Sequence, residues 1–448
     1  MANILIISYI FPPLNSTGCR RVYTWAKYLK RLGHKVSILT ADTPDDERTK
    51  NFVVDCSAFQ SYRLRYFDPR SLIKRIFKVQ GPISNEFGGS HKKRLIELLL
   101  DKGLRILNRY LSSRGILFGT TRMPTFSDLW FFQAYKKAKM LIQEHDIKII
   151  ITNSPPPVGN LVGLALKKRF KDILWIQDFR DLWTQNPVHS GLFPFTLTEG
   201  FLERKCINHS DVIIVVSEIL KQWLQEKYPQ KTKDIFVIEN GYDEELLREI
   251  RVDDFPESKK TIIYTGTLYE RRSNPKRLFE VIDKNYTYLK DKVEISFYGA
   301  YETKVILDKF FDKYPNTKDI IKYKGFLSTK DALSEQKKAD VLLFIERDKE
   351  NDGVLTAKLF EYMALRKPIL CLGISPSSYV GGILQKTGLG IFCGDNTRLI
   401  EQSINAIIKD EVRISPDDDF ISNFSREKQV KRLDELIRYY CESFSYTY

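Results

Sequence analysis

The sequence has few cysteines and histidines, and neither residue type is arranged for metal binding or cross-linking. It contains six cysteines and five histidines in 448 residues, and no two cysteines form a Cys-x-x-Cys pair. Scattered cysteines of this kind argue against a zinc site or a disulfide framework and fit a reducing compartment. We therefore expect a cytoplasmic protein without a metal site.

Long hydrophobic runs are also missing. No stretch of 18 or more apolar residues occurs, so we expect no transmembrane helix. The opening residues pass directly from Asn3 into Ile4–Ile7 and lack the basic segment of a secretory signal. The composition, with 43% hydrophobic and 29% charged residues, is typical of a globular protein, and 448 residues are more than one ordinary core accommodates. Two domains are expected.

Acidic residues are fewer than basic ones, 57 against 71, and the excess of positive charge is local. The net charge is +14, and the stretch 63–114 carries 13 basic and four acidic residues. A partner of opposite sign is implied, such as a phosphorylated substrate, an anionic membrane or a nucleic acid. No aromatic-basic interleaving or nucleic-acid-binding module accompanies the charge, so we expect no nucleic acid.

Within this stretch, residues 94–111 mix leucines at helical spacing with cations. Such a helix lies in a membrane interface when its apolar face meets lipid, and basic residues near an anionic surface contribute roughly 1 kcal/mol each. Peripheral binding to the inner face of the cell membrane is one interpretation. An ordinary amphipathic helix packed on a sheet is the other, and the sequence leaves both open.

Short apolar runs alternate with helical patterns along most of the chain. This alternation is typical of parallel sheets covered by helices on both faces. The predicted strands are Ile4–Ser8, Lys35–Thr40, Ile147–Thr152, Ile173–Gln177, Val212–Val216, Ile235–Ile238, Thr261–Tyr264, Val293–Tyr298, Ile320–Tyr323, Asp340–Ile345 and Pro368–Leu372. The clearest helices are predicted at Arg20–Leu32, Val158–Leu166, Ala357–Leu365 and Arg426–Tyr440.

The pattern predicts an α/β protein of two Rossmann-like, doubly wound domains facing across a cleft. Residues 1–243 form the first domain, which carries a basic insertion at about 44–122, and 244–260 form a linker. Residues 261–420 form the second domain, and 421–448 a C-terminal helix that crosses back to the first. Ligands of such sheets bind beyond the carboxyl ends of the strands, so functional residues are expected directly after strands.

In the first domain, two segments fit this rule. Thr17 and Gly18 end a loop that follows the first strand and opens a helix, and a helix N-terminus favours an anion. Asp178, Arg180 and Asp181 follow the strand Ile173–Gln177. The carboxylates suit a sugar hydroxyl and Arg180 a phosphate, although an ion-paired turn that only braces the loop explains the same residues.

In the second domain, Gly266, Arg271 and Arg272 follow the first strand, where cationic donors would stabilise a diphosphate. The alternative is a pair of solvated arginines. Gly325 follows another strand, and its loop is suited to contact a nucleotide base through backbone groups.

The most informative segment is 351–364. Thr356 is predicted as the N-cap of the helix Ala357–Leu365, so that the helix N-terminus faces a phosphate. Glu361 lies about one turn further along, where ribose hydroxyls would be natural partners, although a surface Glu on an amphipathic helix is the alternative.

Together these segments resemble glycosyltransferase family 4, retaining enzymes of the GT-B fold. The resemblance extends over most of the chain and is carried by short segments whose order and spacing are more specific than any one of them. They are Phe11–Gly18, Leu32–Val36, Asp211–Ser217, Ile238–Asp243, Tyr264–Leu268, Ala339–Leu343 and Lys358–Ala364.

The resemblance implies a glycosyltransferase of the surface-polysaccharide type, which uses a nucleotide-diphosphate sugar as donor substrate and no metal. No cofactor is therefore expected. It implies that Glu361 binds the ribose, that Leu355 and Thr356 bind phosphate through their backbone, and that Arg272 binds the diphosphate. Lys358, Arg271, Gly266 and Gly325 belong to the same donor-binding set, and the Gly18 loop closes over the phosphates or the sugar. Asp178, Arg180 and Asp181 are the candidate catalytic residues, and the acceptor is a glycan or a lipid-diphosphate-linked sugar.

The sequence departs from the family pattern in three respects. The first loop has Thr17-Gly18 where a double glycine is common, and the family's frequent catalytic-region histidine has no clear match, with Asp178 or Asp181 in that neighbourhood. The family's paired glutamates, which have seven residues between them, would require Glu where this chain has Gly353, so only Glu361 is present. Two alternatives therefore stay open beside the transferase: a non-catalytic partner protein that keeps the fold, and a nucleotide-sugar 2-epimerase of the same architecture.

Overall fold

The structure is a computed structural model that divides into two compact units. It describes residues 1–42, 52, 54–57, 59–67, 127–186, 195–250, 252, 259–269, 273–346, 353 and 355–445. Unit 1 comprises Met1–Ile238 and Val430–Tyr448, and unit 2 comprises Glu239–Gln429. Most of the basic insertion at 44–122 lies outside the described residues, as do Arg271 and Arg272.

Unit 1 is built on a parallel sheet in which the described strands follow the order β3-β2-β1-β4-β5-β6-β7. These strands are β1 (Asn3–Ile7), β2 (Lys35–Ala41), β3 (Gln60–Leu64), β4 (Ile149–Ser154), β5 (Leu174–Phe179), β6 (Val212–Val215) and β7 (Ile235–Val237). The central strands β4, β5 and β6 are buried along their whole length. That is why they appear in the sequence as continuous rather than alternating apolar runs.

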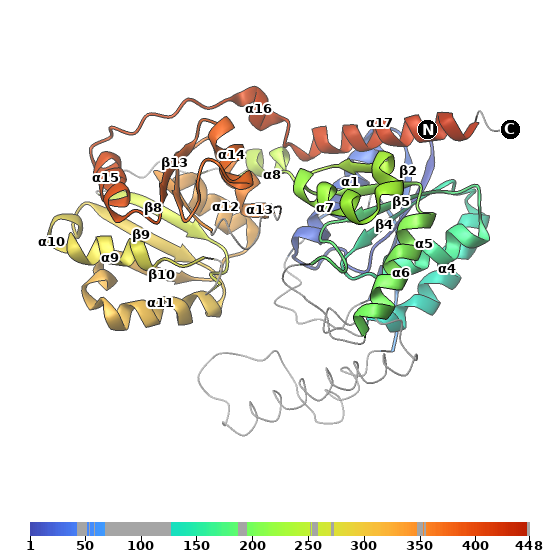
Figure 1. Cartoon of the computed structure of the whole chain (residues 1–448), viewed down its shortest axis with the longest axis horizontal. Coiled ribbons are helices and arrows are strands. Elements are labelled where there is room, and N and C mark those ends of the chain that lie inside the picture. Colours follow the sequence, from blue (N-terminus) through green and yellow to red (C-terminus); the bar gives the residue numbers. More distant parts are fainter. Residues whose placement is uncertain are drawn as a thin grey trace, which may run out of the picture. The chain divides into compact units, whose positions relative to one another are not determined.

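Helices cover both faces of this sheet (Figure 1). They are α1 (Thr17–Arg31), α4 (Phe131–Glu144), α5 (Val158–Arg169), α6 (Phe195–His209), α7 (Glu218–Lys227) and α17 (Arg426–Ser445), with short 3₁₀ turns η2 (Ser127–Trp130) and η3 (Pro229–Asp234). Helices α1 and α17 pack on one face, where Val430, Leu433 and Ile437 join the core. Helices α4, α5, α6 and α7 cover the other face.

Unit 2 repeats the plan with the strand order β10-β9-β8-β11-β12-β13, again parallel. Its strands are β8 (Lys260–Thr265), β9 (Val293–Tyr298), β10 (Ile321–Gly325), β11 (Val341–Ile345), β12 (Ile369–Leu372) and β13 (Gly390–Gly394). Counted from β8 this is the order 3-2-1-4-5-6 of a dinucleotide-binding domain.

The helices of unit 2 also form two layers. They are α8 (Glu244–Glu249), α9 (Lys276–Lys284), α10 (Tyr286–Leu289), α11 (Tyr301–Lys313), α12 (Thr329–Lys338), α13 (Ala357–Leu365), α14 (Tyr379–Lys386), α15 (Thr397–Ile408) and α16 (Asp418–Ser422), with the 3₁₀ turn η4 (Pro315–Asp319). Helices α9, α11 and α15 pack on one face of the sheet. Helices α13, α14 and α16 pack on the other.

The segment expected to be a linker contains a helix instead. Residues Glu244–Glu249 form α8, and the Asp243 side chain accepts from the backbone N–H groups of Glu245 and Leu246 at its start. Leu247 packs against the core of unit 2. A capped turn with a single apolar anchor is enough to order this short segment.

The two sheets share one topological feature that positions ligands. In unit 1 the strand order reverses between β1 and β4, and in unit 2 between β8 and β11. At such a switch point the loops after the two strands diverge to opposite faces and leave room for a ligand at the carboxyl edge. The loops after β1, β4, β8 and β11 are therefore the places to look for a site.

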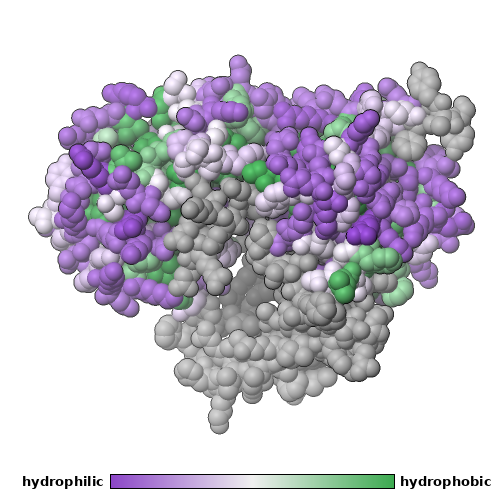
Figure 2. All heavy atoms as spheres, viewed as in Figure 1, coloured by the Kyte–Doolittle hydropathy of each residue, from purple (hydrophilic) through white to green (hydrophobic). Residues whose placement is uncertain are grey.

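One face of the described surface is mainly polar. On the face in Figure 2, hydrophilic residues cover most of the described atoms, and hydrophobic ones show in small patches. Among the helices of the described residues, none combines the length and apolar character that crossing a membrane requires.

Candidate functional site

The carboxyl edge of the unit 2 sheet is lined by bare backbone. Gly266 follows β8 with φ +117°, and Gly325 ends β10 with φ +89°. Among the described residues, a Cβ built on either glycine would meet no atom within 4 Å. Glycine is needed here for its backbone conformation, and the open space lets a ligand approach the main chain closely. The prediction that Gly266 and Gly325 lie at a strand end is thus confirmed.

Helix α13 begins at the same edge, after strand β11. Thr356 occupies the N-cap position with extended backbone, as predicted, but its side chain makes no capping hydrogen bond. Its Oγ1 atom is buried and has no hydrogen-bond partner in the structure. A buried hydroxyl without a hydrogen-bond partner costs about 1–3 kcal/mol. The Thr356 hydroxyl and the free backbone N–H groups of the first turn of α13 are therefore suited to donate hydrogen bonds to an oxygen of a ligand.

Lys358 lies in the first turn of α13, where a cation is electrostatically unfavourable beside the positive helix end. Its ammonium sits 4.0 Å from the centroid of the Tyr264 ring and 5.1 Å from that of Phe344, at the ends of β8 and β11. The two rings hold the ammonium at the switch point. A helix N-terminus and a lysine at one place together favour an anion.

A hydrogen-bond brace fixes the end of β8 against α13. The Tyr362 hydroxyl accepts from the backbone N–H of Thr265 at 3.0 Å, and the Gln336 side chain donates to the Thr265 Oγ1 at 2.8 Å. Burial raises the pKa of Tyr362 to about 12, so the hydroxyl stays protonated at neutral pH. Glu361, next to Tyr362 in sequence, is partly exposed and lies one turn after Lys358 on the same face of the helix.

Residues before α13 are held from within unit 2. Leu355 is buried, and its carbonyl accepts from the Asn240 side chain at 3.5 Å. The Asn240 Oδ1 atom is buried without a partner. Gly353 has φ +104°, a conformation that a glutamate at this position would adopt only with strain. The role of Asn240 is not evident from the sequence, although Asn240 lies in Ile238–Asp243, one of the segments that carry the family resemblance.

In unit 1, the loop after β1 brings Gly18 against an arginine. The Ser16 side chain caps α1 by accepting from the Cys19 N–H, and Gly18 lies in the first turn. A Cβ on Gly18 would be 1.9 Å from the Arg180 Nη1 atom, so the guanidinium rests directly on this glycine. The Arg180 backbone N–H donates to the Ser154 carbonyl, and its guanidinium contacts the partly exposed Asp181 at 3.3 Å.

Asp178 is placed differently from what the sequence suggests. Its side chain is fully buried and forms a bidentate ion pair with Arg21, with distances of 2.9 and 3.0 Å. The Asn153 side chain donates to the same carboxylate at 2.6 Å. Both oxygens are therefore occupied inside the domain, which makes Asp178 a positioning residue here rather than one that touches a sugar hydroxyl. Asp181 and Arg180 are the members of this segment with exposed atoms.

The structure thus places the predicted residues at two strand edges. Gly266, Gly325, Leu355, Thr356, Lys358 and Glu361 belong to the edge of unit 2, and Thr17, Gly18, Arg180 and Asp181 to that of unit 1. Arg271 and Arg272 lie outside the described residues, so their predicted contacts are untested. Within the described residues, no group of three or more His, Cys, Asp or Glu side chains is arranged to hold a metal ion.

Comparison with known proteins finds one family model and several solved structures that are similar to this chain. Residues 103–246 match the family model described as Glycosyltransferase Family 4. A search of curated protein sequences finds no significant match to this chain.

Several solved structures share the fold at low identity. Sucrose-phosphate synthase from Thermosynechococcus elongatus is 13% identical, with a TM-score of 0.61, and the match covers 99% of this chain and 100% of that one. The Anabaena protein HepE, solved in complex with UDP, is 11% identical with a TM-score of 0.57 and coverages of 97% and 99%. A UDP-N-acetylglucosamine 2-epimerase is 13% identical with a TM-score of 0.52 and coverages of 99% and 97%.

These matches establish the fold class. The chain is an α/β protein of two parallel-sheet, Rossmann-like domains with the GT-B architecture seen in glycosyltransferases, as the sequence predicts. Since an epimerase shares the architecture, the reaction has to be argued from the site.

Proposed function

We propose that this protein is a glycosyltransferase that moves a sugar from a nucleotide-diphosphate sugar to a hydroxyl group, with unit 2 holding the donor. One observation carries the proposal. At the switch point of unit 2, the uncapped N-terminus of α13, the unpartnered Thr356 hydroxyl and the Lys358 ammonium occur beside the bare backbone of Gly266. The match to a glycosyltransferase family model and the UDP complex of HepE support it.

The chemistry of this edge suits a diphosphate leaving group. The first backbone N–H groups of α13 and the Thr356 hydroxyl donate to phosphate oxygens, and Lys358 neutralises part of the charge. Glu361 accepts hydrogen bonds from ribose hydroxyls one turn further along the helix. Because these groups stabilise negative charge without a metal ion, we propose a metal-independent enzyme that needs no cofactor.

We further propose that the reaction proceeds with retention. The bond from the anomeric carbon to the diphosphate oxygen breaks, a bond from that carbon to the acceptor oxygen forms on the same face, and the acceptor proton passes to the departing phosphate. No strong protein base is then required, which is compatible with Gly353 in place of a second glutamate. Arg180 and Asp181 of unit 1 are available to bind the acceptor.

The acceptor is proposed to be a glycan or a lipid-diphosphate-linked sugar in polysaccharide biosynthesis. The support is the positive stretch 63–114, which suits an anionic membrane surface. Flotation with vesicles that contain anionic lipid tests this. Since Gln60–Leu64 is strand β3, the variant should neutralise Lys92, Lys93 and Arg94 rather than delete the stretch. Equal flotation of the wild type and this variant would argue against the membrane proposal.

Calorimetry on the full chain tests the donor site. We expect a nucleoside diphosphate to bind, Glu361→Ala and Lys358→Met each to weaken binding about tenfold or more, and Arg398→Ala, at an exposed position of the same unit, to leave it unchanged. Absence of binding to any nucleoside diphosphate would favour the non-catalytic alternative.

Product analysis separates the transferase from the epimerase. Incubation with nucleotide sugars and acceptor extracts should yield free nucleoside diphosphate together with a glycosylated acceptor. Interconversion of two nucleotide sugars, without release of nucleoside diphosphate, would show the epimerase instead.

A further inference from the structure

Helix α6 of unit 1 exposes apolar side chains and buries acidic ones, the reverse of the usual arrangement. Leu197 is 66% exposed and Phe201 is 56% exposed. Glu199 and Glu203 are each 1% exposed. Leu197, Phe201 and Lys205 follow one another at intervals of four residues and therefore form one outward stripe on the helix. Figure 2 shows hydrophobic residues at the surface over the region that α6 occupies in Figure 1, bordered by hydrophilic ones.

The buried acid Glu203 fixes this orientation of the helix. Its carboxylate accepts hydrogen bonds from the Thr184 backbone N–H at 2.6 Å and from the Lys227 ammonium and the Tyr228 hydroxyl at 2.7 Å each. Turning α6 so that its apolar stripe faced the sheet would break all three bonds. The outward position of the apolar side chains is therefore a consequence of the fold.

Helix α4 presents a second stripe of the same kind. Phe132, Lys136 and Met140, again four residues apart, are all exposed. Phe132 keeps a ring contact with Phe131 and is still 66% exposed. Because α4, α5 and α6 each precede one of the parallel strands β4, β5 and β6, the three helices run in the same direction and begin at the carboxyl edge of the sheet. Helix α5 packs against both α4 and α6, so the apolar beginnings of the two stripes lie toward one edge (Figure 1).

The cations around these stripes are not matched by acids. In the described residues of the three helices, Glu144 is the one exposed acidic residue. Lys205 lies 4.2 Å from the centroid of the Phe201 ring, so a cation and an apolar side chain are presented together. Six basic residues of these helices are wholly or partly exposed and form no ion pair within the part of the chain that the structure describes: Lys136, Lys139, Lys168, Arg169, Arg204 and Lys205. The outer face of the helices is therefore positively charged.

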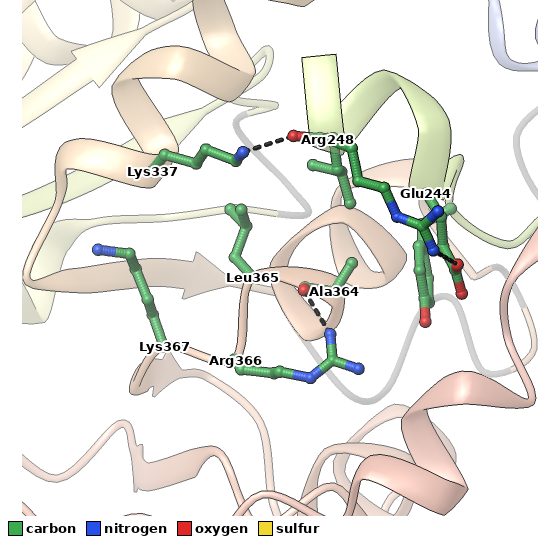
Figure 3. Close-up of a pocket in the computed structure, with 9 residues that line it drawn as sticks. Glu244, Arg248, Lys337, Ala364, Leu365, Arg366 and Lys367 are labelled. Carbon is green, nitrogen blue, oxygen red and sulfur yellow. Dashed lines mark hydrogen bonds and ion pairs between the residues drawn. The ribbon is translucent and has the colours of Figure 1, made fainter. Parts of the chain in front are cut away.

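Figure 3 shows a contrasting group of cations, which line a pocket in unit 2. Arg248 pairs there with Glu244 at 2.9 Å. Arg366 pairs with Asp418, and Lys337 donates to two backbone carbonyls. These cations are satisfied within unit 2, whereas the six on the outer face of unit 1 remain available to an external anionic surface.

We propose that the outer face of α4 and α6 docks on an anionic membrane surface, with Phe132, Leu197 and Phe201 entering the interface. Interfacial binding combines apolar side chains with lysines and arginines whose carbon stems lie along the apolar zone and whose charges meet the headgroups. Neighbouring helix axes are about 8–10 Å apart, so the stripes on α4 and α6 are separated by roughly 16–20 Å. A fluid anionic surface meets both stripes at once, whereas a second copy of this chain would present the same positive charge. This surface lies outside the stretch 63–114 and does not depend on the donor site.

Flotation of the full chain with vesicles tests the apolar part of this surface. The wild type should float with vesicles of phosphatidylglycerol and phosphatidylcholine, and less at high salt or with phosphatidylcholine alone. Leu197→Ser combined with Phe201→Ser should weaken binding about tenfold or more, because two large apolar side chains are lost from the interface. Leu399→Ser, which removes an exposed leucine of α15 in unit 2, is the matched control and should bind as the wild type does.

A second double variant tests the charge. Lys136→Gln combined with Arg204→Gln should weaken binding about tenfold or more, since each basic residue near an anionic surface contributes roughly fivefold to the affinity. Arg398→Gln, at an exposed position of α15, should leave binding unchanged. Nucleoside diphosphate binding, measured by calorimetry on the same proteins, should be equal in all of them, so this proposal and that of the donor site fail independently.

Equal flotation of the wild type and either double variant would overturn the proposal, as would equal binding to phosphatidylcholine alone. Loss of flotation only on neutralising Lys92, Lys93 and Arg94 would assign the membrane contact to that stretch and also overturn it. So would a loss of unit 1 stability in the Leu197 and Phe201 variant, read by tryptophan fluorescence, because the chain itself would then cover these side chains. Self-association that this variant abolishes, without vesicle binding, would assign the face to a second copy instead.

Discussion

Units 1 and 2 share the order of their first six strands but differ in whether side chains or open backbone occupy the switch point. In unit 1, side chains fill the edge: Arg21 and Asp178 are paired inside the domain, and Arg180 covers Gly18. In unit 2, Gly266 and Gly325 leave the backbone open, the buried Thr356 hydroxyl has no hydrogen-bond partner among the described residues, and the Lys358 ammonium lies over ring faces. The same topology is therefore compatible with an edge closed by side chains and with one prepared for a ligand on the main chain.

The largest effect is expected from breaking the closed network of unit 1. Asp178→Ala leaves the Arg21 charge buried without its partner, which costs about 3–5 kcal/mol of unfolding free energy. All five tryptophans lie in unit 1, so tryptophan fluorescence in a denaturant titration reports on this unit alone.

Lys148→Ala is the matched control for this variant. It removes an exposed ion pair with Asp146 in the same unit and should change stability by no more than about 0.5–1 kcal/mol. Equal stability of Asp178→Ala and the wild type would mean that the buried pair does not hold unit 1 together.

A smaller effect is expected from filling the space over Gly18. Gly18→Ala forces the Arg180 guanidinium aside and should cost about 1–3 kcal/mol in the same fluorescence titration. The double variant with Arg180→Ala should recover part of this cost, with a coupling of about 0.5–3 kcal/mol, because the clash is with that side chain.

Gly266→Ala provides the contrast in unit 2. The added methyl group meets no atom of the described residues, but the alanine has to adopt φ +117°. The loss of stability is therefore backbone strain, and shortening a neighbouring side chain should not restore it. Strict additivity of Gly18→Ala and Arg180→Ala would show that the two edges do not differ in the way described.

An effect of similar size is expected at the brace on β8. Tyr362→Phe removes the hydroxyl bonded to the Thr265 N–H and should destabilise unit 2 by about 1–3 kcal/mol near pH 7. Because the pKa of Tyr362 is raised to about 12 from 10, its stabilising effect is complete below pH 10. It falls as pH rises from 10 to 12, by up to about 1.4 kcal/mol per pH unit.

The free energy of unfolding is measured at each pH in this range by denaturant titration. The titration is followed by far-UV circular dichroism, because that signal also reports on unit 2. In Tyr362→Phe this contribution to the pH dependence should be missing, so the variant and the wild type should approach each other above pH 10. A constant difference between them from pH 7 to 12 would contradict the assigned role.

The predictions from sequence succeeded where local pattern determines structure. The helix Ala357–Leu365 and the strand Val293–Tyr298 have the predicted bounds, since each combines a continuous apolar pattern with a clear start. The short strands Gln60–Leu64 and Gly390–Gly394 were not predicted, because five mixed residues at a sheet edge carry little periodic signal. Helix α8 was missed because six residues are too few to show a helical period.

The strand-end positions of the candidate residues were predictable, but their side-chain partners were not. The positions of Gly266, Gly325 and Thr356 at the ends of strands and the start of a helix follow from the order of elements, and their proposed roles stay predictions. The burial of Asp178 depends on its ion pair with Arg21, which lies 157 residues away in sequence, and no local sequence pattern predicts that contact. Long-range pairing of charges is set by tertiary packing, which a single sequence does not display.

The packing of α17 has a consequence for biosynthesis. Val430, Leu433 and Ile437 complete a core that contains Ile4 and Ile6, yet all of unit 2 is translated between them. While the ribosome is producing unit 2, the apolar groove of unit 1 that α17 will occupy is still open. Unit 2 has all its residues before unit 1 does, so the domain begun first is the last that can finish folding, and chaperone protection of the nascent chain would matter most during that interval.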